Sequence, residues 1–142
     1  MTVSTASATW EGGLKGGKGT FAGQSGLIAG PYTFATRFEG AKGTNPEELV
    51  AAAHASCLSM ALSAGLEKAG TPATRVTTTA ACTMAVVDGA PRVTTMKLTV
   101  RAVVAGLDQP TFLTAAEEAK NGCPISNLMK GNVSVELDAR LE

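Results

Sequence analysis

The hydrophobic and polar positions change their period along the chain, and these changes mark predicted strands and helices. The first forty residues are rich in glycine and predict short strands in SATWEG, GKGTFAG and PYTFATRF, each bounded by Gly or Pro. We interpret this region as a three-stranded N-terminal meander.

The longest apolar stretch, LVAAAHASCLSMALSAGL over residues 49–66, carries no charge and predicts a long helix. Asn45 suits the N-cap, Pro46 the first helical position, and Glu48 the capping-box position that reaches back to the cap. The sequence AGTP after Lys68 supplies a glycine stop followed by proline. The predicted helix therefore runs from Pro46 to about Lys68.

Two segments with a period of two follow, over residues 75–87 and 93–103. The alternation is clean in the second, where Met96, Leu98, Val100 and Ala102 share one face and Thr95, Lys97, Thr99 and Arg101 share the other. The intervening VDGAPR contains an Asp-Gly turn, which predicts a hairpin.

The C-terminal third predicts two more helices and a last strand. A helix over about residues 110–121 is capped by Asp108, CPISNLMKG supplies a short second helix start, and NVSVELDARL alternates as a half-buried strand. The order β-β-β-α-β-β-α-α-β predicts an α+β fold, and residues 1–142 are expected to form a single domain.

Composition removes several classes of function. Twelve basic and twelve acidic residues cancel, and no basic stripe is present, so nucleic acid and a membrane surface are not expected partners. Residues 49–66 are long enough to span a bilayer, but the stretch is rich in Ala and Ser, contains His54 and lacks an aromatic belt. We therefore expect a helix surrounded by protein. The N-terminus lacks the pattern of a signal peptide, which favours a cytoplasmic protein with reduced cysteines.

The three cysteines differ in predicted surroundings. Cys82 falls on the inward face of a strand, where cysteine behaves as a small hydrophobic residue. Cys123 precedes Pro124 at a helix start, where unpaired N–H groups lower a thiol pKa, although an ordinary capping cysteine is the alternative. Cys57 lies inside a helix, so a reactive thiolate there needs a cation.

Two side chains are candidates to activate Cys57, and both remain open at this point. His54 lies three residues earlier on the same helical face, as a base or as a packed or solvent-facing histidine. Arg37, at the end of the third predicted strand, is a candidate cation or a solvated arginine. Neither metal-ligand spacing nor a phosphate-binding loop is present, so no metal or other cofactor is expected.

The segments ATRFEGAKGTNPEELVAAAHASCLSMAL and NGCPISNLMKG together resemble the osmotically inducible protein C (OsmC) branch of the OsmC/Ohr family, and the resemblance covers essentially the whole chain. It implies an OsmC-like intertwined homodimer in which two β-sheets wrap around paired long central helices. It also implies a thiol-dependent peroxidase that reduces organic hydroperoxides, and hydrogen peroxide, in oxidative and osmotic stress defence.

The resemblance assigns roles residue by residue. Cys57 corresponds to the peroxidatic cysteine, which becomes a sulfenic acid, and Cys123 to the cysteine that resolves it to a disulfide. Arg37 corresponds to the arginine that activates the thiolate, and Glu47 to the carboxylate that orients this arginine. The reductant implied is a dithiol such as dihydrolipoamide or a lipoylated protein.

Helix geometry adds a condition. Glu47 and Cys57 are ten residues apart on one predicted helix, hence about 15 Å apart along its axis. Antiparallel packing of two copies would bring Glu47 of one chain towards Cys57 of the other. Two alternatives remain: a non-enzymatic dimer that binds a small apolar ligand, and a hydrolase or acyl transferase that uses Cys57 and His54.

Overall fold

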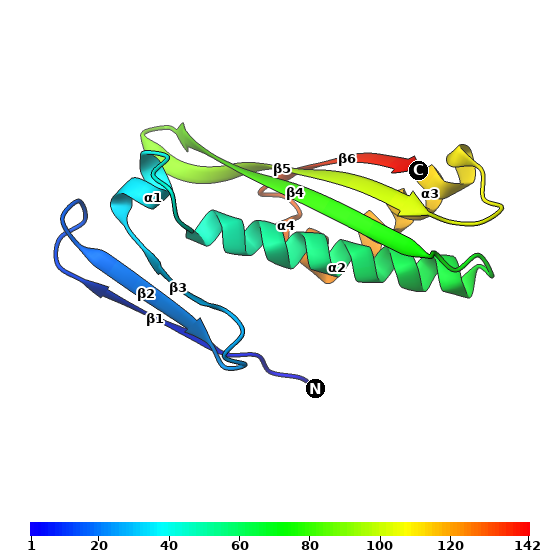
Figure 1. Cartoon of the computed structure of the whole chain (residues 1–142). Helices are drawn as coiled ribbons and strands as arrows, with labels where there is room; N and C mark the ends of the chain where they lie inside the picture. Colours follow the sequence, from blue (N-terminus) through cyan, green and yellow to red (C-terminus); the bar gives the residue numbers. More distant parts are fainter. The chain divides into compact units, whose positions relative to one another are not determined.

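The computed structural model describes residues 1–142, which form two compact units, Met1–Glu48 and Leu49–Glu142. Each unit contains one three-stranded sheet (Figure 1). The first holds strands β1 (Ala6–Glu11), β2 (Lys18–Gly23) and β3 (Ala29–Tyr32), in the order β1-β2-β3 with antiparallel neighbours. The predicted N-terminal meander is confirmed.

The end of the third strand differs from the prediction. Strand β3 stops at Tyr32, and the rest of PYTFATRF turns into the short helix α1 (Phe34–Phe38). The cause is a local capping box: Thr36 N–H donates to Thr33 Oγ1, and Thr33 N–H donates to Thr36 Oγ1. Arg37 therefore lies in the last turn of a helix and not at the end of a strand.

Helix α2 (Pro46–Lys68) begins and ends where the sequence predicts. Asn45 Oδ1 accepts a hydrogen bond from Glu48 N–H at 2.9 Å, as expected of the cap. At the other end Gly70 adopts φ +81°, and the N–H groups of Gly70 and Thr71 donate to Glu67 and Leu66 carbonyls. This is a Schellman stop, and its left-handed position suits glycine.

The second unit continues with β4 (Arg75–Val87), β5 (Ala90–Val103), helices α3 (Gln109–Gly122) and α4 (Pro124–Met129), and β6 (Ser134–Leu141). Asp88 and Gly89 both have positive φ in the hairpin turn between β4 and β5, as a type I′ turn requires. Strand β6 pairs with β5 in parallel, which alternation alone did not predict. A parallel pair needs a crossover, and α3 and α4 supply it.

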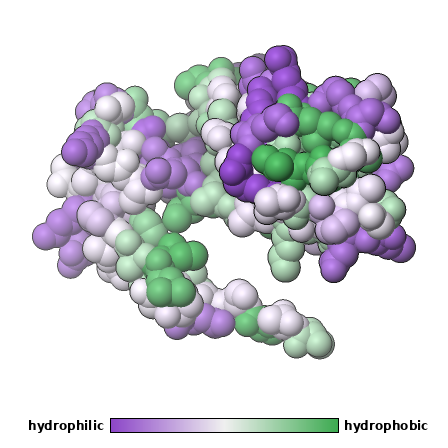
Figure 2. Space-filling model, turned by 45° about the vertical axis from the view of Figure 1, so that its right-hand side comes forward, coloured by the Kyte–Doolittle hydropathy of each residue, from purple (hydrophilic) through white to green (hydrophobic).

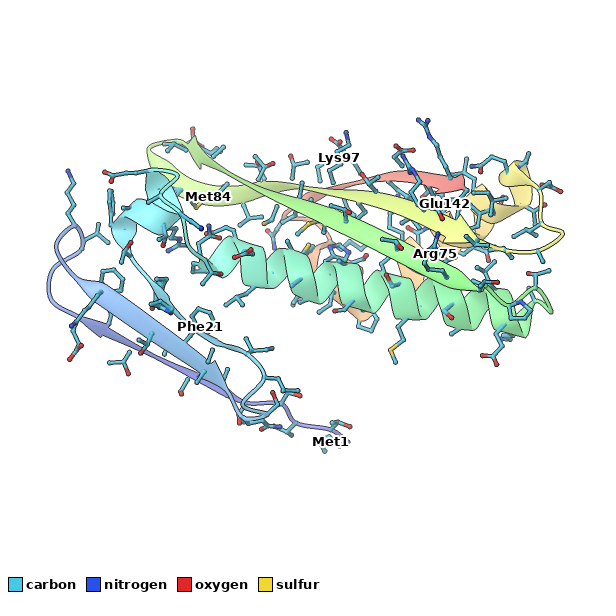
Figure 3. The ribbon with its side chains drawn as sticks, in the orientation of Figure 1. Met1, Phe21, Arg75, Met84, Lys97 and Glu142 are labelled. Atoms are coloured by element: carbon cyan, nitrogen blue, oxygen red, sulfur yellow. The ribbon has the colours of Figure 1, made fainter.

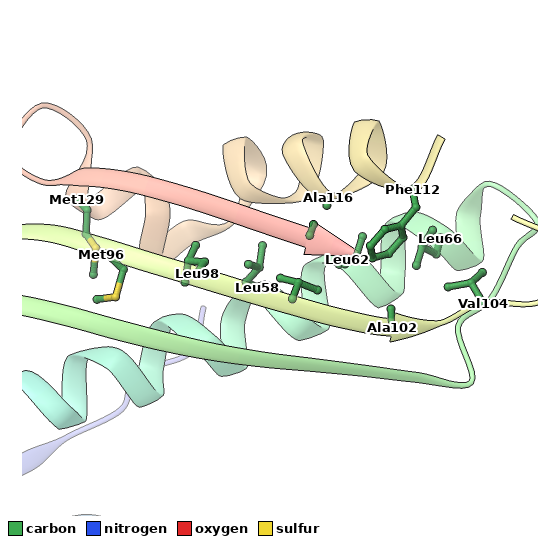
Figure 4. Close-up of a cluster of buried hydrophobic side chains, with 12 residues drawn as sticks. Leu58, Leu62, Leu66, Met96, Leu98, Ala102, Val104, Phe112, Ala116 and Met129 are labelled. Carbon is green, nitrogen blue, oxygen red and sulfur yellow. The ribbon is translucent and has the colours of Figure 1, made fainter. Parts of the chain in front are cut away.

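Side chains from the helices cover one face of this second sheet. Figure 4 shows Leu58, Leu62 and Leu66 of α2 meeting residues of β5 and α3 in one buried cluster. The predicted apolar face of β5 is fully buried: Met96, Leu98, Val100 and Ala102 each have an exposed fraction of 0%. Beyond β6, Glu142 forms an ion pair with Arg75 at the start of β4 (Figure 3). The α+β class is therefore confirmed.

The remaining surface of α2 is unusually apolar. Its buried residues are spaced by four (His54, Leu58, Leu62 and Leu66), so they occupy a single stripe. Outside the stripe the helix shows small uncharged residues and Met60, which is 74% exposed. By length and composition α2 could cross a membrane, but such a helix is also typical of a protein core. Figure 2 shows hydrophobic side chains at the surface of the molecule.

Candidate active site

The structure brings Cys57 and Cys123 together, although 66 positions separate them in the chain. Their sulfur atoms lie 2.8 Å apart and both residues are thiols. A disulfide bond measures about 2.0 Å, so only a small approach separates the pair from a bond. Cys123 is fully buried, whereas Cys57 is partly exposed. Only Cys57 of this pair is thus open to a reactant from outside.

The position of Cys123 follows from two helices that meet there. It is the C-cap of α3 and the N-cap of α4, with an extended backbone that separates them. Its N–H donates to Ala119 carbonyl in α3, and its carbonyl accepts from Asn127 N–H in α4. Both backbone groups are therefore held, and the side chain is directed towards α2. The predicted helix start at Pro124 is confirmed.

The two thiols of this pair differ in acidity. Burial, followed by the hydrogen bond with Cys123, raises the pKa of Cys57. Burial also acts to raise the pKa of Cys123, but hydrogen bonds with Cys57 and with the N–H and hydroxyl of Ser126 outweigh it and lower the pKa. Within Leu49–Glu142, no cationic side chain acts on either thiol. Within one unit, the negative charge of the pair is therefore favoured on Cys123.

Arg37 and Glu47 form the main ion pair of the first unit. Arg37 Nη2 lies 2.7 Å from Glu47 Oε1, and Arg37 Nε lies 3.2 Å from both carboxylate oxygens. Glu47 is only 12% exposed and Arg37 36%. The guanidinium also lies 5.2 Å from the ring centroid of Phe38. This arrangement fixes the guanidinium from one side and leaves Nη1 without a protein partner.

His54 does not pair with Cys57 through a hydrogen bond. Its Nε2 lies 2.7 Å from Ser126 Oγ, and the ring is fully buried. Burial lowers the pKa of His54. The packed-histidine interpretation is the one the structure supports. Sequence reasoning missed Ser126, although its place as the third residue of the helix that Cys123 caps is a readable signal.

The third cysteine lies elsewhere. Cys82 is half-buried on β4 opposite Met96 and packs against the hydrophobic cluster, as predicted for a small hydrophobic residue. No group of three or more His, Cys, Asp or Glu side chains is arranged to hold a metal ion.

An α+β fold that holds one partly exposed thiol against a buried one has the arrangement that a redox-active cysteine pair requires. The sequence model of the family described as OsmC-like protein matches residues 39–138. The chain belongs to the OsmC family.

Known relatives agree with this assignment over nearly the whole length. The chain is 46% identical to "Peroxiredoxin OsmC" of Escherichia coli (strain K12) over 130 residues, which is 91% of each protein. Among solved structures, the organic hydroperoxide resistance protein OhrB of Bacillus subtilis gives a TM-score of 0.76 at 25% identity, covering 96% of this chain and 98% of that one. An organic hydroperoxide resistance protein from Elizabethkingia anophelis gives 0.80 at 25% identity, covering 99% of both.

Proposed function

We propose that the protein is a cysteine-based peroxidase that reduces organic hydroperoxides, and hydrogen peroxide, through Cys57 and Cys123. The observation that carries the proposal is the pair of thiols with sulfur atoms 2.8 Å apart, of which only Cys57 is partly exposed. A relative named a peroxiredoxin and structural neighbours named for hydroperoxide resistance support thiol-dependent peroxidase activity.

The chemistry needs two steps at sulfur. In the first, the Cys57 thiolate attacks the terminal peroxide oxygen, an S–O bond forms, the O–O bond breaks, and the leaving oxygen takes up a proton as alcohol or water. In the second, Cys123 attacks the Cys57 sulfenic acid, an S–S bond forms, the S–O bond breaks, and the hydroxyl group leaves as water. An external dithiol, such as dihydrolipoamide or a lipoylated protein, then exchanges with the disulfide and returns both thiols.

Arg37 is the proposed source of charge for the first step. The pKa of Cys57 is raised by burial and by the hydrogen bond with Cys123, so this thiol needs an added cation to ionise. Glu47 holds the guanidinium by Nε and Nη2, which leaves Nη1 to face a thiolate. Because Glu47 and Cys57 are ten residues apart on α2, or about 15 Å, we assign this arginine to the site of a second copy.

A homodimer also explains the surface of α2. The 18-residue apolar window of this helix is only 22% buried within the chain. A second α2 packed against it would cover the small uncharged face, and a twofold arrangement places two equivalent sites at the interface. In such an intertwined dimer, residues 1–142 would act as one domain.

The two alternatives are less well supported. A Cys57–His54 hydrolase needs the imidazole as the base for Cys57, but His54 is fully buried and bonds to Ser126. A purely ligand-binding dimer gives no reason for two thiols to approach within 2.8 Å.

The test is intact mass and thiol counting after one equivalent of cumene hydroperoxide is added to reduced protein. We expect a loss of two thiols and two mass units, with the link mapped to Cys57 and Cys123. In Cys123→Ser the sulfenic acid on Cys57 should persist and react with dimedone, whereas Cys82→Ser should behave as wild type. Survival of all three thiols would reject the peroxidase and favour the ligand-binding alternative.

A further inference from the structure

A buried line of polar atoms leads from α2 to the sulfur of Cys123. His54 Nε2 lies 2.7 Å from Ser126 Oγ, and Ser126 stands in the first turn of α4, three residues after Cys123. His54 is 0% exposed and Ser126 9%, so water does not compete for this bond. Neither side chain has a part in the peroxide chemistry described so far.

The second ring nitrogen of His54 fixes the direction of this hydrogen bond. His54 Nδ1 is buried and has no hydrogen-bond partner. An unpaired buried N–H is rarer in proteins than an under-used acceptor, so Nδ1 is the nitrogen without a proton. Burial lowers the pKa of His54, which keeps the ring neutral. The Nε2–H group therefore donates to Ser126 Oγ, and the hydroxyl proton of Ser126 is free to be donated elsewhere.

Cys123 is the N-cap of α4 and Ser126 is the third residue of this helix, so the hydroxyl of Ser126 stands beside Cys123 Sγ at the helix start. Burial works against the Cys123 thiolate, while hydrogen bonds with Cys57 and with the N–H and hydroxyl of Ser126 lower its pKa. Of the other titratable groups on α2, Cys57 lies against Cys123 directly, and His54 bonds to Ser126. Lys120, in the last turn of α3, pairs with Glu117 at 2.7 Å, and no charged group of the strands acts on this thiol.

We propose that His54 and Ser126 form a buried donor chain, Nε2–H to Oγ–H to Sγ, that holds Cys123 as the attacking sulfur of the disulfide-closing step. The proposal rests on the peroxidase function proposed above. In this step Cys123 sulfur bonds to Cys57 sulfur, the S–O bond of the sulfenic acid breaks, and hydroxide leaves and takes up a proton as water. Cys123 sulfur is oxidised and Cys57 sulfur reduced. His54 and Ser126 are positioning residues, because neither touches the peroxide.

The test follows disulfide closure in a single turnover with one equivalent of cumene hydroperoxide, quenched at intervals and read by mass, from pH 5 to pH 10. Ser126→Ala removes the donated proton, so Cys123 loses thiolate at neutral pH but becomes a stronger nucleophile once ionised. For each unit by which its pKa rises, closure should slow about threefold below that pKa and quicken about threefold above it. The pH profiles of variant and wild type should therefore cross.

Control variants distinguish the loss of the donor chain from a change in packing. Ser126→Thr and His54→Gln each retain a donor and should keep the wild-type profile, as should Leu128→Ala on the exposed side of α4. A Ser126→Ala profile slowed equally at every pH, or not slowed at all, would overturn the proposal. In wild-type protein, nitrogen NMR should find a neutral His54 with its proton on Nε2, and a proton on Nδ1 would also overturn it. If wild type forms neither sulfenic acid nor disulfide, the peroxidase function itself fails.

Discussion

At the scale of single residues, the placement of one negative charge decides the roles of the two cysteines. Cys123 is favoured to ionise within its unit but is fully buried, while Cys57 is partly exposed but has a raised pKa. Exposure and acidity are therefore divided between the two thiols. A peroxidase built on this pair needs a cation from elsewhere to move the charge onto Cys57, and Arg37 is the proposed one.

Removing that cation should move the pH dependence of the first step. In Arg37→Ala we expect Cys57 oxidation by cumene hydroperoxide to slow by about 100-fold at pH 7, as loss of a charge-assisted hydrogen bond implies. The rate should then rise with pH into the alkaline range, because the pKa of Cys57 is raised. Stopped-flow fluorescence or quenched mass measurement gives this profile.

Neighbouring carboxylates supply a matched control for the same step. Glu47→Gln should slow Cys57 oxidation by about tenfold, which is less than the effect of Arg37→Ala, because it loosens the arginine without removing it. Glu48→Gln keeps the backbone N–H that donates to Asn45 Oδ1. In this variant Cys57 should be oxidised at the wild-type rate. Equal rates for Glu47→Gln and Glu48→Gln would contradict the orienting role of Glu47.

At the scale of elements, helix ends set by neighbouring residues could be predicted from the sequence, whereas the pairing of distant strands could not. Helix α2 could be predicted at both ends because Asn45 and Gly70 act through their immediate neighbours. The third strand was predicted to run through PYTFATRF, but the capping box between Thr33 and Thr36 ends it at Tyr32. The parallel partner of β6 depends on a crossover of about 30 residues, which no local pattern specifies.

The same is true of the candidate site. The sequence pointed to Cys57 and Cys123 as chemically interesting, and the family resemblance paired them, but the approach of their sulfurs depends on where α3 ends against α2. The Arg37–Glu47 pair lies within one unit and is observed as an ion pair, while its action on Cys57 stays a prediction. Ser126 was missed because its partner His54 is 72 positions away.

The Schellman stop of α2 gives a prediction about stability. Gly70→Ala should destabilise the protein by about 1 kcal/mol, because alanine is strained at φ +81°. Gly70→Asn should lose less stability than Gly70→Ala, since asparagine tolerates this conformation better. Urea denaturation followed by circular dichroism measures both, and an alanine variant as stable as wild type would show that the turn relaxes.

At the scale of the whole molecule, the proposed dimer accounts for three features that a single chain does not account for. The first is the uncharged outer face of α2, which a second helix would cover. The second is the separation of Glu47 and Cys57 along α2, and the third is an arginine held by its carboxylate with a donor to spare. One second copy of the chain, packed on α2, accounts for all three together.

A charge on α2 should separate the copies. Met60→Glu places a carboxylate on the outer face of this helix, where the native side chain is 74% exposed in the single chain. We expect sedimentation to show monomers, with peroxide turnover falling at least tenfold because Arg37 of the partner is lost. Leu113→Glu, on the exposed face of α3, is the control and should remain dimeric and active. A dimeric and active Met60→Glu protein would show that the second copy does not pack on this face of α2.

The separation of Cys57 and Cys123 along the sequence has a consequence for the growing polypeptide. Cys57 and Cys82 are made before Cys123, which is 66 positions after Cys57; at about 5 to 20 residues per second the delay is about 3 to 13 s. During that interval the nascent chain carries two thiols and lacks Cys123, the proposed partner of Cys57. A ribosome that stalls or stops early under peroxide stress would release a fragment whose Cys57 can be oxidised but has no Cys123 to rescue it. Complete synthesis is thus a condition for the chain to reverse the oxidation of Cys57.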